Sequence, residues 1–260
     1  MYSNSLFKKK LEALSASESL VFLGAVNLKG QEPQYLLFEN WINLGKQGGL
    51  DYLNKNKHLR KEPNKIFEGA QSSLVFGFSC YDGDRLNFKS WKNPRVAQYA
   101  RFYNYHKILK KKGCKVLEQL QEFDKEIKGR VLVDSAPVLE RALASRTSKG
   151  FIGKNNMYIH PIYGSYLLLM EIFLNKAIEE DKPAKIDVKS RSKNGGCGSC
   201  RRCEVHCPTG ALTSYSLDAR KCISYYTIEH RGCIPVEYWK YLKLYLYGCD
   251  ICQLSCPYNR

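Results

Sequence analysis

The chain has 260 residues, of which 44% are hydrophobic, 12% aromatic and 25% charged. This length can hold one sizeable core and a smaller second domain, and the composition excludes a disordered chain. The 41 Lys and Arg residues against 25 Asp and Glu give a formal charge of +16, which favours an anionic partner such as a phosphate backbone over a merely solvated basic surface.

The apolar runs are too short to cross a membrane. Residues 20–26 and 166–170 are the most apolar stretches, and both fall far below the roughly 20 residues that a spanning helix needs. Lys8 to Lys10 precede an apolar stretch, but acidic and serine residues interrupt it and no small-residue cleavage site follows. We therefore expect no membrane association and a cytoplasmic location, where thiols stay reduced and free to bind metal.

Helical and strand patterns alternate in the first third of the chain. Apolar residues at helical spacing predict helices, and continuous apolar runs predict buried strands. The predicted order is a helix over 5–14, a strand over 21–28, a helix over 36–45, a short helix from Leu50 to Pro63, a strand over 73–80 and a turn at 82–84. Cys80 is interpreted as a small buried hydrophobic residue.

The longest helical pattern extends from Val96 to Phe123 and is expected to break near Gly113. Its aromatic beginning could line a flat ligand or belong to the core, and the core is favoured. These aromatic and neighbouring residues are Tyr99, Phe102, Tyr103, Tyr105 and His106. The same helix carries the basic residues Lys107, Lys110, Lys111, Lys112 and Lys115.

Asp134 follows directly after a short predicted strand over 131–133. Ligands gather at the carboxyl ends of strands in α/β folds, so Asp134 is a candidate functional residue. The alternative is a helix N-cap, because a helix is expected from Ser135 to Ser145. Beyond it, the predicted elements are a glycine-bracketed loop at 150–153 and strands over 158–161 and 166–173.

A polar linker over 182–196 separates two predicted domains, residues 1–181 and 182–260. The linker carries Lys189, Arg191 and Lys193, which extend the basic character into the second domain. There, a short helix over 217–230 is expected to carry Cys222, and a second helix rich in Tyr and Trp begins at Pro235. Cys114 and Cys233 are interpreted as packing residues.

The second domain opens with a dense cysteine run. Its spacing is C-x2-C-x2-C-x3-C-P, which in two-cluster ferredoxins gives three ligands to one [4Fe–4S] cluster and the fourth to another. The residues are Cys197, Cys200, Cys203, Cys207 and Pro208. A second set, C-x2-C-x3-C-P, is formed by Cys249, Cys252, Cys256 and Pro257, and Cys222 supplies the missing upstream ligand.

Crossing the ligands predicts two [4Fe–4S] clusters. One would be bound by Cys197, Cys200, Cys203 and Cys256, and the other by Cys222, Cys249, Cys252 and Cys207. A pair of structural zinc sites is the alternative, because C-x2-C pairs are common in zinc ribbons. The doubled x3-C-P ending favours the clusters, since two zinc ribbons would not need it.

Several phrases together resemble the epoxyqueuosine reductase family. They are Val133–Arg141, Phe151–Asn155, Gly164–Tyr166, the cysteine run, Leu217–Tyr225 and Tyr247–Gln253. The similarity covers nearly the whole chain. It is more specific than a ferredoxin match, because the phrases around Asp134 and Cys222 lie outside any ferredoxin pattern.

The resemblance implies an α+β protein with an N-terminal α/β domain, of the nitroreductase and reductive-dehalogenase type, that binds cobalamin. A ferredoxin-like domain with two [4Fe–4S] clusters follows. It also implies the last step of queuosine synthesis, which is reduction of the epoxide of epoxyqueuosine at the tRNA wobble position. The implied partners are the tRNA anticodon loop and an external low-potential electron donor, and a monomer is expected.

By the same resemblance, Asp134 matches the proton donor of the family. Residues on segments that face the corrinoid or the substrate are Tyr105, His106, Tyr158, Ser224 and Asp250. The chemistry is consistent, because converting an epoxide to an alkene needs two electrons and an acid for the departing oxygen. We expect burial against the corrinoid to keep Asp134 protonated.

Three features depart from the family pattern. Asn104 stands where the family commonly has Asp, and Lys149 precedes Gly150 in a loop that is usually more apolar. The sequence ends at Arg260, whereas many relatives continue into helical repeats that help hold tRNA, so tRNA affinity is expected to depend on the basic surface. The alternatives are a reductive-dehalogenase relative that acts on a small molecule and a ferredoxin-type electron carrier without corrinoid.

Overall fold

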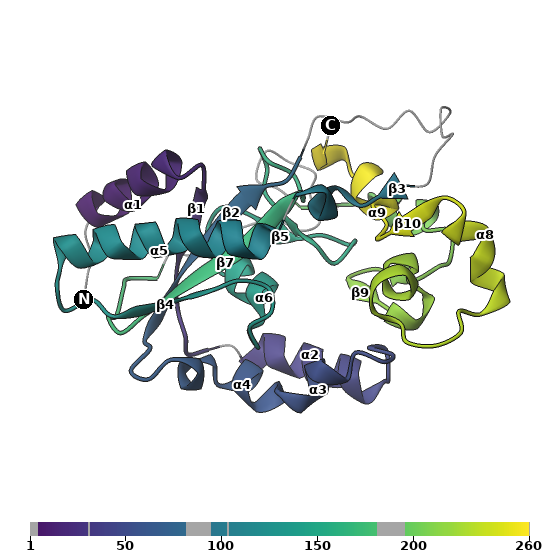
Figure 1. Cartoon of the computed structure of the whole chain (residues 1–260), viewed down its shortest axis with the longest axis horizontal. Coiled ribbons are helices and arrows are strands. Elements are labelled where there is room, and N and C mark those ends of the chain that lie inside the picture. Colours follow the sequence, from purple (N-terminus) through teal and green to yellow (C-terminus); the bar gives the residue numbers. More distant parts are fainter. Residues whose placement is uncertain (1–4, 31, 82–94, 103, 181–195, 260) are drawn as a thin grey trace.

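The computed structural model describes residues 5–30, 32–81, 95–102, 104–180 and 196–259. The predicted turn at 82–84, Tyr103, the basic residues of the linker and the predicted domain boundary after residue 181 lie outside these ranges. Within them, a mixed helix and strand domain and a smaller cysteine-rich half lie side by side (Figure 1).

A four-stranded antiparallel sheet forms the centre of the larger domain. Its strand order is β1 (Val21–Asn27), β2 (Ser72–Ser79), β7 (Leu167–Leu174) and β4 (Gly129–Leu132). The two inner strands pair in an unbroken register from Ser72 opposite Leu174 to Ser79 opposite Leu167. The largely apolar sequences of β2 and β7 are explained by this central position, because both sheet faces are covered.

Helices cover the two faces of the sheet (Figure 1). On one side, α1 (Ser5–Ser17) and α5 (Tyr105–Phe123) pack on Met170, Ile172 and Leu174 of β7. On the other side, α6 (Glu140–Ser145) packs on Leu169 and Phe173. The alternation of side chains along a strand therefore divides β7 between two apolar clusters. Three layers result, with the sheet in the middle.

Two predicted helices begin later than expected. The helix predicted from Val96 starts at Tyr105, after β3 (Arg95–Val96) and a 3-10 turn over Gln98–Arg101. The helix continues through Gly113. The missing side chain of this glycine lets the helix approach the sheet. A Cβ there would stand 2.6 Å from Val131 Cγ1. Similarly, α6 begins at Glu140 and not at Ser135, so Asp134 is not its N-cap.

The remaining elements of the larger domain are short. They are α2 (Glu32–Asn43), α3 (Asp51–Lys55), α4 (Lys57–Lys61), a 3-10 turn at Pro63–Ile66, and a hairpin of β5 (Phe151–Ile152) and β6 (Tyr158–Ile159). Pro63 thus begins a turn, as its fixed φ allows, and does not merely end a helix. No helix in the described part of the chain is both long and apolar enough to cross a membrane.

The cysteine-rich half is built from turns and very short elements. They are α7 (Arg202–His206), β8 (Leu212–Thr213), β9 (Ser216–Leu217), 3-10 turns at Ala219–Lys221 and Val236–Tyr238, a π-type turn at Tyr225–Glu229, α8 (Trp239–Leu242), β10 (Tyr245–Tyr247), α9 (Ile251–Leu254) and a 3-10 turn at Pro257–Asn259. The helix predicted over 217–230 is therefore divided into turns, with Cys222 between two of them.

Main-chain pairing joins the two halves. β3 and β10 form a parallel pair in which Ala97 N–H donates to Tyr247 O at 2.8 Å. The buried Asp250 carboxylate accepts the backbone N–H of Gln98 at 2.7 Å. At the end of the described chain, Asn259 Oδ1 accepts the N–H of Ser165 at 2.7 Å. The halves therefore form one packed unit along this seam.

Candidate functional site

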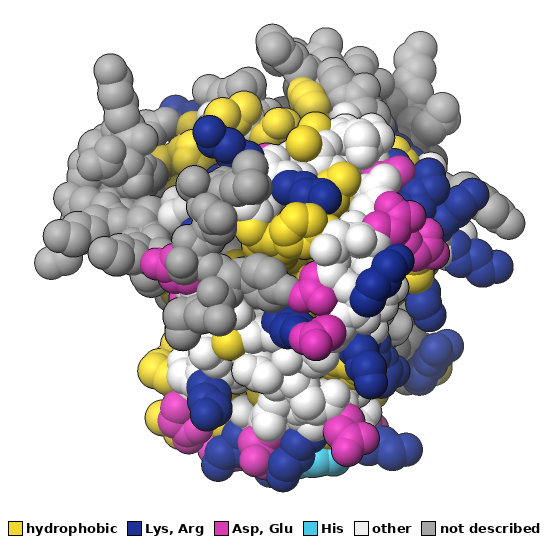
Figure 2. Space-filling view, turned by 90° about the vertical axis from the view of Figure 1, so that its left-hand side faces the viewer, with side chains coloured by type: hydrophobic (Ala, Val, Ile, Leu, Met, Phe, Trp, Pro, Cys, Tyr) yellow, Lys and Arg dark blue, Asp and Glu magenta, His cyan; other side chains and the backbone are white. Residues whose placement is uncertain are grey.

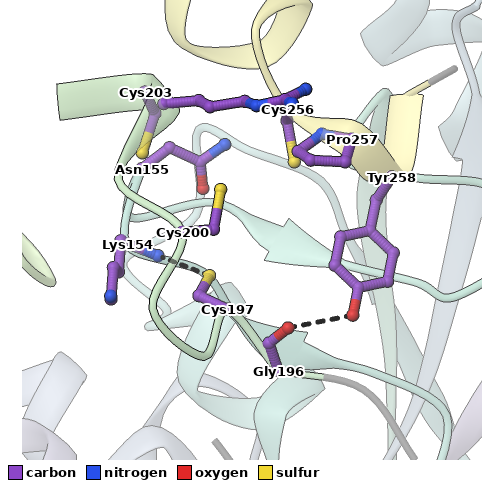
Figure 3. A pocket seen from close by; sticks show the side chains of 10 residues that line it. Lys154, Asn155, Gly196, Cys197, Cys200, Cys203, Cys256, Pro257 and Tyr258 are labelled. Carbon is purple, nitrogen blue, oxygen red and sulfur yellow. Dashed lines mark hydrogen bonds between the residues drawn. The ribbon is translucent and has the colours of Figure 1, made fainter. Parts of the chain in front are cut away.

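A partly open cavity lies where the hairpin β5–β6 meets the cysteine-rich half. Four cysteine side chains line it together with Lys154 and Asn155 (Figure 3). The cysteines are Cys197, Cys200, Cys203 and Cys256. The fold thus brings three cysteines of the first run together with one from the second run, which is the crossed set that the spacing predicts.

The surroundings of this cavity suit a metal centre that binds thiolates. The backbone N–H of Lys154 donates to Cys197 Sγ at 3.3 Å (Figure 3). The Lys154 ammonium donates to Gly198 O at 2.7 Å. Burial raises the pKa of Cys203 to about 11, so a bound cation is needed to keep this thiol ionised at neutral pH.

The donor spacing also bears on the kind of metal centre. Within the described ranges, no three His, Cys, Asp or Glu side chains converge closely enough to hold a single metal ion. Zinc, with Zn–S bonds of about 2.3 Å, would need such convergence, whereas a cubane places its own iron and sulfide between the thiolates. Thiols arranged around a cavity therefore suit the larger group.

The second predicted set also gathers in one region. The Cys249 thiol interacts electrostatically with those of Cys222 and Cys207, and burial raises the pKa of Cys249 to about 12. Burial raises the pKa of Cys252 well above its ordinary value, with Cys249 and Cys222 as its nearest charged neighbours. Cys222 Sγ accepts hydrogen bonds from Ser224 and Tyr225. The described contacts thus place Ser224 beside this cysteine group.

The cysteines outside both sets have other surroundings. Cys80 is buried and its thiol lies 3.4 Å from Tyr166 O, which agrees with its interpretation as a packing residue. Cys114 is half-buried on α5, and Cys233 is exposed. An exposed thiol is not a packing residue, so the interpretation of Cys233 was wrong.

Asp134 lies at the end of β4, close to the first turn of α5. The Tyr105 hydroxyl donates to Asp134 Oδ2 at 2.6 Å, and His106 Nε2 lies 2.8 Å from the same oxygen. The Asp134 side chain is 55% exposed. The protein atoms alone therefore do not provide the burial that we expect a bound corrinoid to provide. Because the sheet is antiparallel, this position results from the β4–α6 turn and not from the strand-end rule of parallel sheets.

The first turn of α5 is fixed by Asn104. This residue is in the left-handed conformation with φ of 44°, and its side chain accepts the Lys107 N–H. Asn and Asp are both effective N-caps, so this departure from the family pattern preserves the helix start. Lys149, the other departure, forms a 2.9 Å ion pair with Glu12 of α1.

Aromatic side chains from several segments surround this carboxylate. Burial, the hydrogen bond to Asp134 and its charge raise the pKa of Tyr105. Burial first, and then Tyr247 and Asp134, raise the pKa of Tyr99. Burial, Glu229 and Asp134 raise the pKa of Tyr52 on α3. Asp134 is thus the shared charge of an aromatic site to which both halves contribute.

Two buried glutamates, Glu140 and Glu171, lie close to Asp134 on the α6 side of the sheet. The Asp134 N–H donates to Glu140 Oε1 at 2.6 Å. Glu171 on β7 is completely buried and interacts with both Glu140 and Asp134. Neither glutamate was predicted from the sequence to have a role. Glu171 could have been singled out, because it is the single charged residue in the apolar strand Leu167–Leu174.

Two further predicted residues are engaged elsewhere. Tyr158 is buried in the core beneath α6, with its hydroxyl 3.4 Å from Thr147 Oγ1. Asp250 is buried at the seam with Gln98, and the Gln253 side chain also donates to it. Described contacts therefore do not bring Tyr158 into the aromatic site, and they give Asp250 a role in joining the halves.

The positive charge is unevenly distributed. On the face remote from the cysteine-rich half, Lys and Arg side chains alternate with Asp and Glu (Figure 2). Ion pairs among the described residues include Lys115–Glu18 at 3.0 Å and Lys176–Glu126 at 2.5 Å. By contrast, Lys107, Lys110 and Lys111 are exposed near the start of α5, which also presents Tyr105 and His106 to Asp134.

Comparison with known families identifies two matches within the chain. The family described as "Epoxyqueuosine reductase QueG, DUF1730" matches residues 60–135, and the family described as "4Fe-4S double cluster binding domain" matches residues 196–259. The first match contains Asp134 and the second contains both cysteine sets.

Whole-chain relatives agree with these matches. An epoxyqueuosine reductase of Leadbetterella byssophila is 31% identical over 97% of this chain and 80% of its own length. That of Cyclobacterium marinum is 37% identical over 85% of this chain and 69% of its own length.

Solved structures agree in fold. The epoxyqueuosine reductase from Streptococcus thermophilus aligns with a TM-score of 0.85 at 27% identity, over 97% of this chain and 66% of that one. An epoxyqueuosine reductase with a modified tRNA-Tyr stem loop aligns with a TM-score of 0.79 at 27% identity, over 98% and 65%. The reductive dehalogenase NpRdhA, at a TM-score of 0.50 and 13% identity, over 74% and 26%, shares the fold alone.

Proposed function

The chain belongs to the epoxyqueuosine reductase family, and from this premise we propose that it reduces the epoxide of epoxyqueuosine at the tRNA wobble position to give queuosine. The observation that carries the proposal is the placement of an exposed carboxyl group, Asp134, in an aromatic site beside the cysteine-rich half. An acid next to a source of electrons is what this reaction requires.

Two [4Fe–4S] clusters and cobalamin are the proposed cofactors. The first cluster would be bound by the thiols around the cavity, namely Cys197, Cys200, Cys203 and Cys256. The second would be bound by Cys222, Cys249, Cys252 and Cys207, whose thiols interact with one another. Buried thiols whose pKa is raised support this assignment, because only a bound cationic centre would hold them as thiolates.

Cobalamin is proposed to bind over Asp134. A corrin is a flat ring with amide side chains, and the site offers aromatic surface from Tyr52, Tyr99 and Tyr105 with polar groups at their tips. Tyr247 and Glu229 reach this region from the cysteine-rich half. The distribution of the site over both halves suits a group that accepts electrons from the clusters.

The chain's own residues account for the proton chemistry. When bound, the clusters and cobalamin supply single electrons and a strong metal-centred reductant. The reaction consumes two electrons and two protons, and the epoxide oxygen leaves as water. Asp134 would donate a proton to that oxygen, while Tyr105 and His106 hold its Oδ2. Covering the site would exclude water and favour the protonated carboxyl.

The proposal includes its partners. A tRNA stem loop is bound in the structure of one relative, and the exposed lysines at the start of α5 could contact phosphates beside the site. An external low-potential donor would reduce the clusters. We further propose a cytoplasmic location, because the thiols of both cysteine sets must remain reduced to bind iron. A monomer is proposed as the oligomeric state.

The decisive experiment is anaerobic reconstitution with iron, sulfide and cobalamin, followed by incubation with epoxyqueuosine-containing tRNA, a chemical reductant and nucleoside mass analysis. Formation of queuosine is the expected result. An enzyme that contains all cofactors and leaves epoxyqueuosine unchanged would exclude the proposal. Unmodified tRNA of the same sequence serves as the control substrate.

A further inference from the structure

Glu171 occupies an unusual position for a charged residue. It lies in the middle of the inner strand β7, opposite Val75 on one side and Leu132 on the other, and none of its surface is exposed. It shares its sheet face with Leu169 and Phe173, which pack beneath α6. No ordinary donor of the described residues is paired with either carboxylate oxygen, and the side chain within hydrogen-bond reach of Glu171 is the Glu140 carboxyl.

An ionised carboxylate cannot remain in such a place without compensation. Burying an isolated charge costs far more than burying the neutral acid, so the group retains its proton instead. Burial raises the pKa of Glu171 well above its ordinary value, and the neighbouring charges of Glu140 and Asp134 raise it further. Glu171 is therefore a protonated acid at neutral pH.

Glu140 links this acid to the candidate site. It is the first residue of α6, the helix that covers the Glu171 face of the sheet, and its Oε1 accepts the Asp134 N–H at 2.6 Å. Burial first, and then the charge of Asp134, raises the pKa of Glu140 as well, so the two carboxyl groups do not both ionise at neutral pH. Glu140 thus stands between a buried acid and the main chain of Asp134.

The main chain of Asp134 needs such a restraint. Its φ is +46°, in the left-handed region that residues with a side chain seldom adopt. Contacts of Oδ2 with Tyr105 and His106 fix the carboxyl end of this residue, and the hydrogen bond that its N–H donates to Glu140 fixes its amide end. Both ends must be fixed for the carboxyl to keep its direction.

We propose that Glu140 and Glu171 form a carboxyl pair that shares one proton and positions Asp134 through the Glu140 hydrogen bond to its amide. Glu171 donates its O–H to the Glu140 carboxylate, and the other Glu140 oxygen accepts the Asp134 N–H. The charged or titratable groups that face the pair are Asp134, Arg141 on α6 and Tyr105 on α5. The pair positions Asp134 and passes no proton to it during the reaction.

The inference rests on the proposed function for the role of Asp134, but the shared proton can be tested without activity. Infrared spectroscopy of the full chain at pH 7 should show the carbonyl absorption of a protonated carboxyl group that shifts in D2O. Glu171→Gln should remove this band, and Glu118→Gln, a change of an exposed glutamate on α5, should retain it. In the wild type the band should disappear as the pH rises well above 8.

A neutral-pH spectrum without the band, or a band that persists in Glu171→Gln, would overturn the proposal. The wild-type titration needs no variant, so a folding failure of Glu171→Gln does not affect it. If Glu171→Gln is unstable, Glu140→Gln, which replaces the charged acceptor with a neutral amide oxygen, should shift the band and serves instead.

The positioning role needs a kinetic test on the reconstituted enzyme. Glu140→Ala should lower kcat roughly 10-fold to 100-fold with KM for tRNA unchanged, the loss expected for one strong hydrogen bond. Glu140→Gln keeps an acceptor oxygen and should recover part of that loss. Equal activities of the Ala and Gln variants would exclude positioning. If the wild type makes no queuosine, the proposed function fails, while the infrared result still decides the carboxyl pair.

Discussion

The hydroxyl of Tyr105 lies 2.6 Å from Asp134 Oδ2, although the two residues come from different elements and are joined only by the packing of α5 against β4. His106 lies 2.8 Å from the same oxygen. These contacts leave Asp134 Oδ1 without a hydrogen bond among the described residues, and this oxygen is the one available to a substrate.

Replacement of Asp134 separates cofactor binding from turnover. Asp134→Asn removes the acid and keeps the size of the side chain, so queuosine formation should be abolished while iron content and cobalamin binding remain those of the wild type. Quantitative metal analysis and the cobalamin visible spectrum check the second half of this statement. Activity near the wild-type level would exclude Asp134 as the acid.

Removing the Tyr105 hydroxyl should weaken but not abolish the reaction. Tyr105→Phe deletes one charge-assisted hydrogen bond of about 1.5–3 kcal/mol, which corresponds to a loss of roughly 10-fold to 100-fold in kcat. KM for tRNA should stay the same, because the ring remains in place. Tyr81→Phe, on an exposed tyrosine near the end of β2, is the matched control and should have no effect.

The crossed cysteine sets predict a specific loss of iron. Cys256→Ser should eliminate the first cluster and retain the second, so the iron content should fall to about half of that of the reconstituted wild type. Cys233→Ser should retain all of the iron, because Cys233 is exposed and lies in neither set. Loss of both clusters in Cys256→Ser despite intact folding, or full retention of iron, would contradict the assignment.

Gly113 tests the contact between α5 and the sheet. Ala is the better helix former, yet Gly113→Ala would place Cβ 2.6 Å from Val131 Cγ1 and 2.7 Å from Met170 Sδ. Overpacking of this kind typically costs about 1–3 kcal/mol, so the midpoint of thermal unfolding should fall. Lys111→Ala, an exposed position on the same helix, should leave it unchanged or raise it.

The Glu140–Glu171 pair predicts a pH dependence of stability. The shared proton is held mainly by Glu171, whose pKa rises well above its ordinary value of 4.5 on folding, so the folded state binds this proton more tightly than the unfolded state. The free energy of unfolding should therefore decrease as the pH rises above 4.5, and this contribution should level off once the folded pair has lost its proton. Glu171→Gln should reduce the slope in thermal unfolding measurements, whereas Glu118→Gln should not.

Much of this organisation is local in sequence and was therefore predictable. The cysteine spacing predicts which thiols of one run gather, because residues two or three apart remain close in any fold, and the family resemblance is confirmed by the relatives. The strands over 21–28, 73–80 and 166–173 were predicted within one residue or two at each end, because buried strands are continuously apolar.

What could not be predicted depends on long-range packing. The start of α6 was placed too early because Pro137 suggested a first turn, whereas the chain bends at Asp134 with a positive φ. The contact between Glu140 and Glu171 arises only when α6 covers β7. The aromatic site likewise joins Tyr52, Tyr99 and Tyr105, which no local pattern connects.

The position of Cys256 has a consequence for biosynthesis. When Cys197, Cys200 and Cys203 have been synthesised, Cys256 and Tyr258 have not. These two residues complete the lining of the cavity, and the Tyr258 ring packs against Phe151. The nascent protein therefore holds three uncapped thiols while the rest of the chain is translated. Assembly of a metal centre on these thiols should consequently wait until Cys256 has been synthesised.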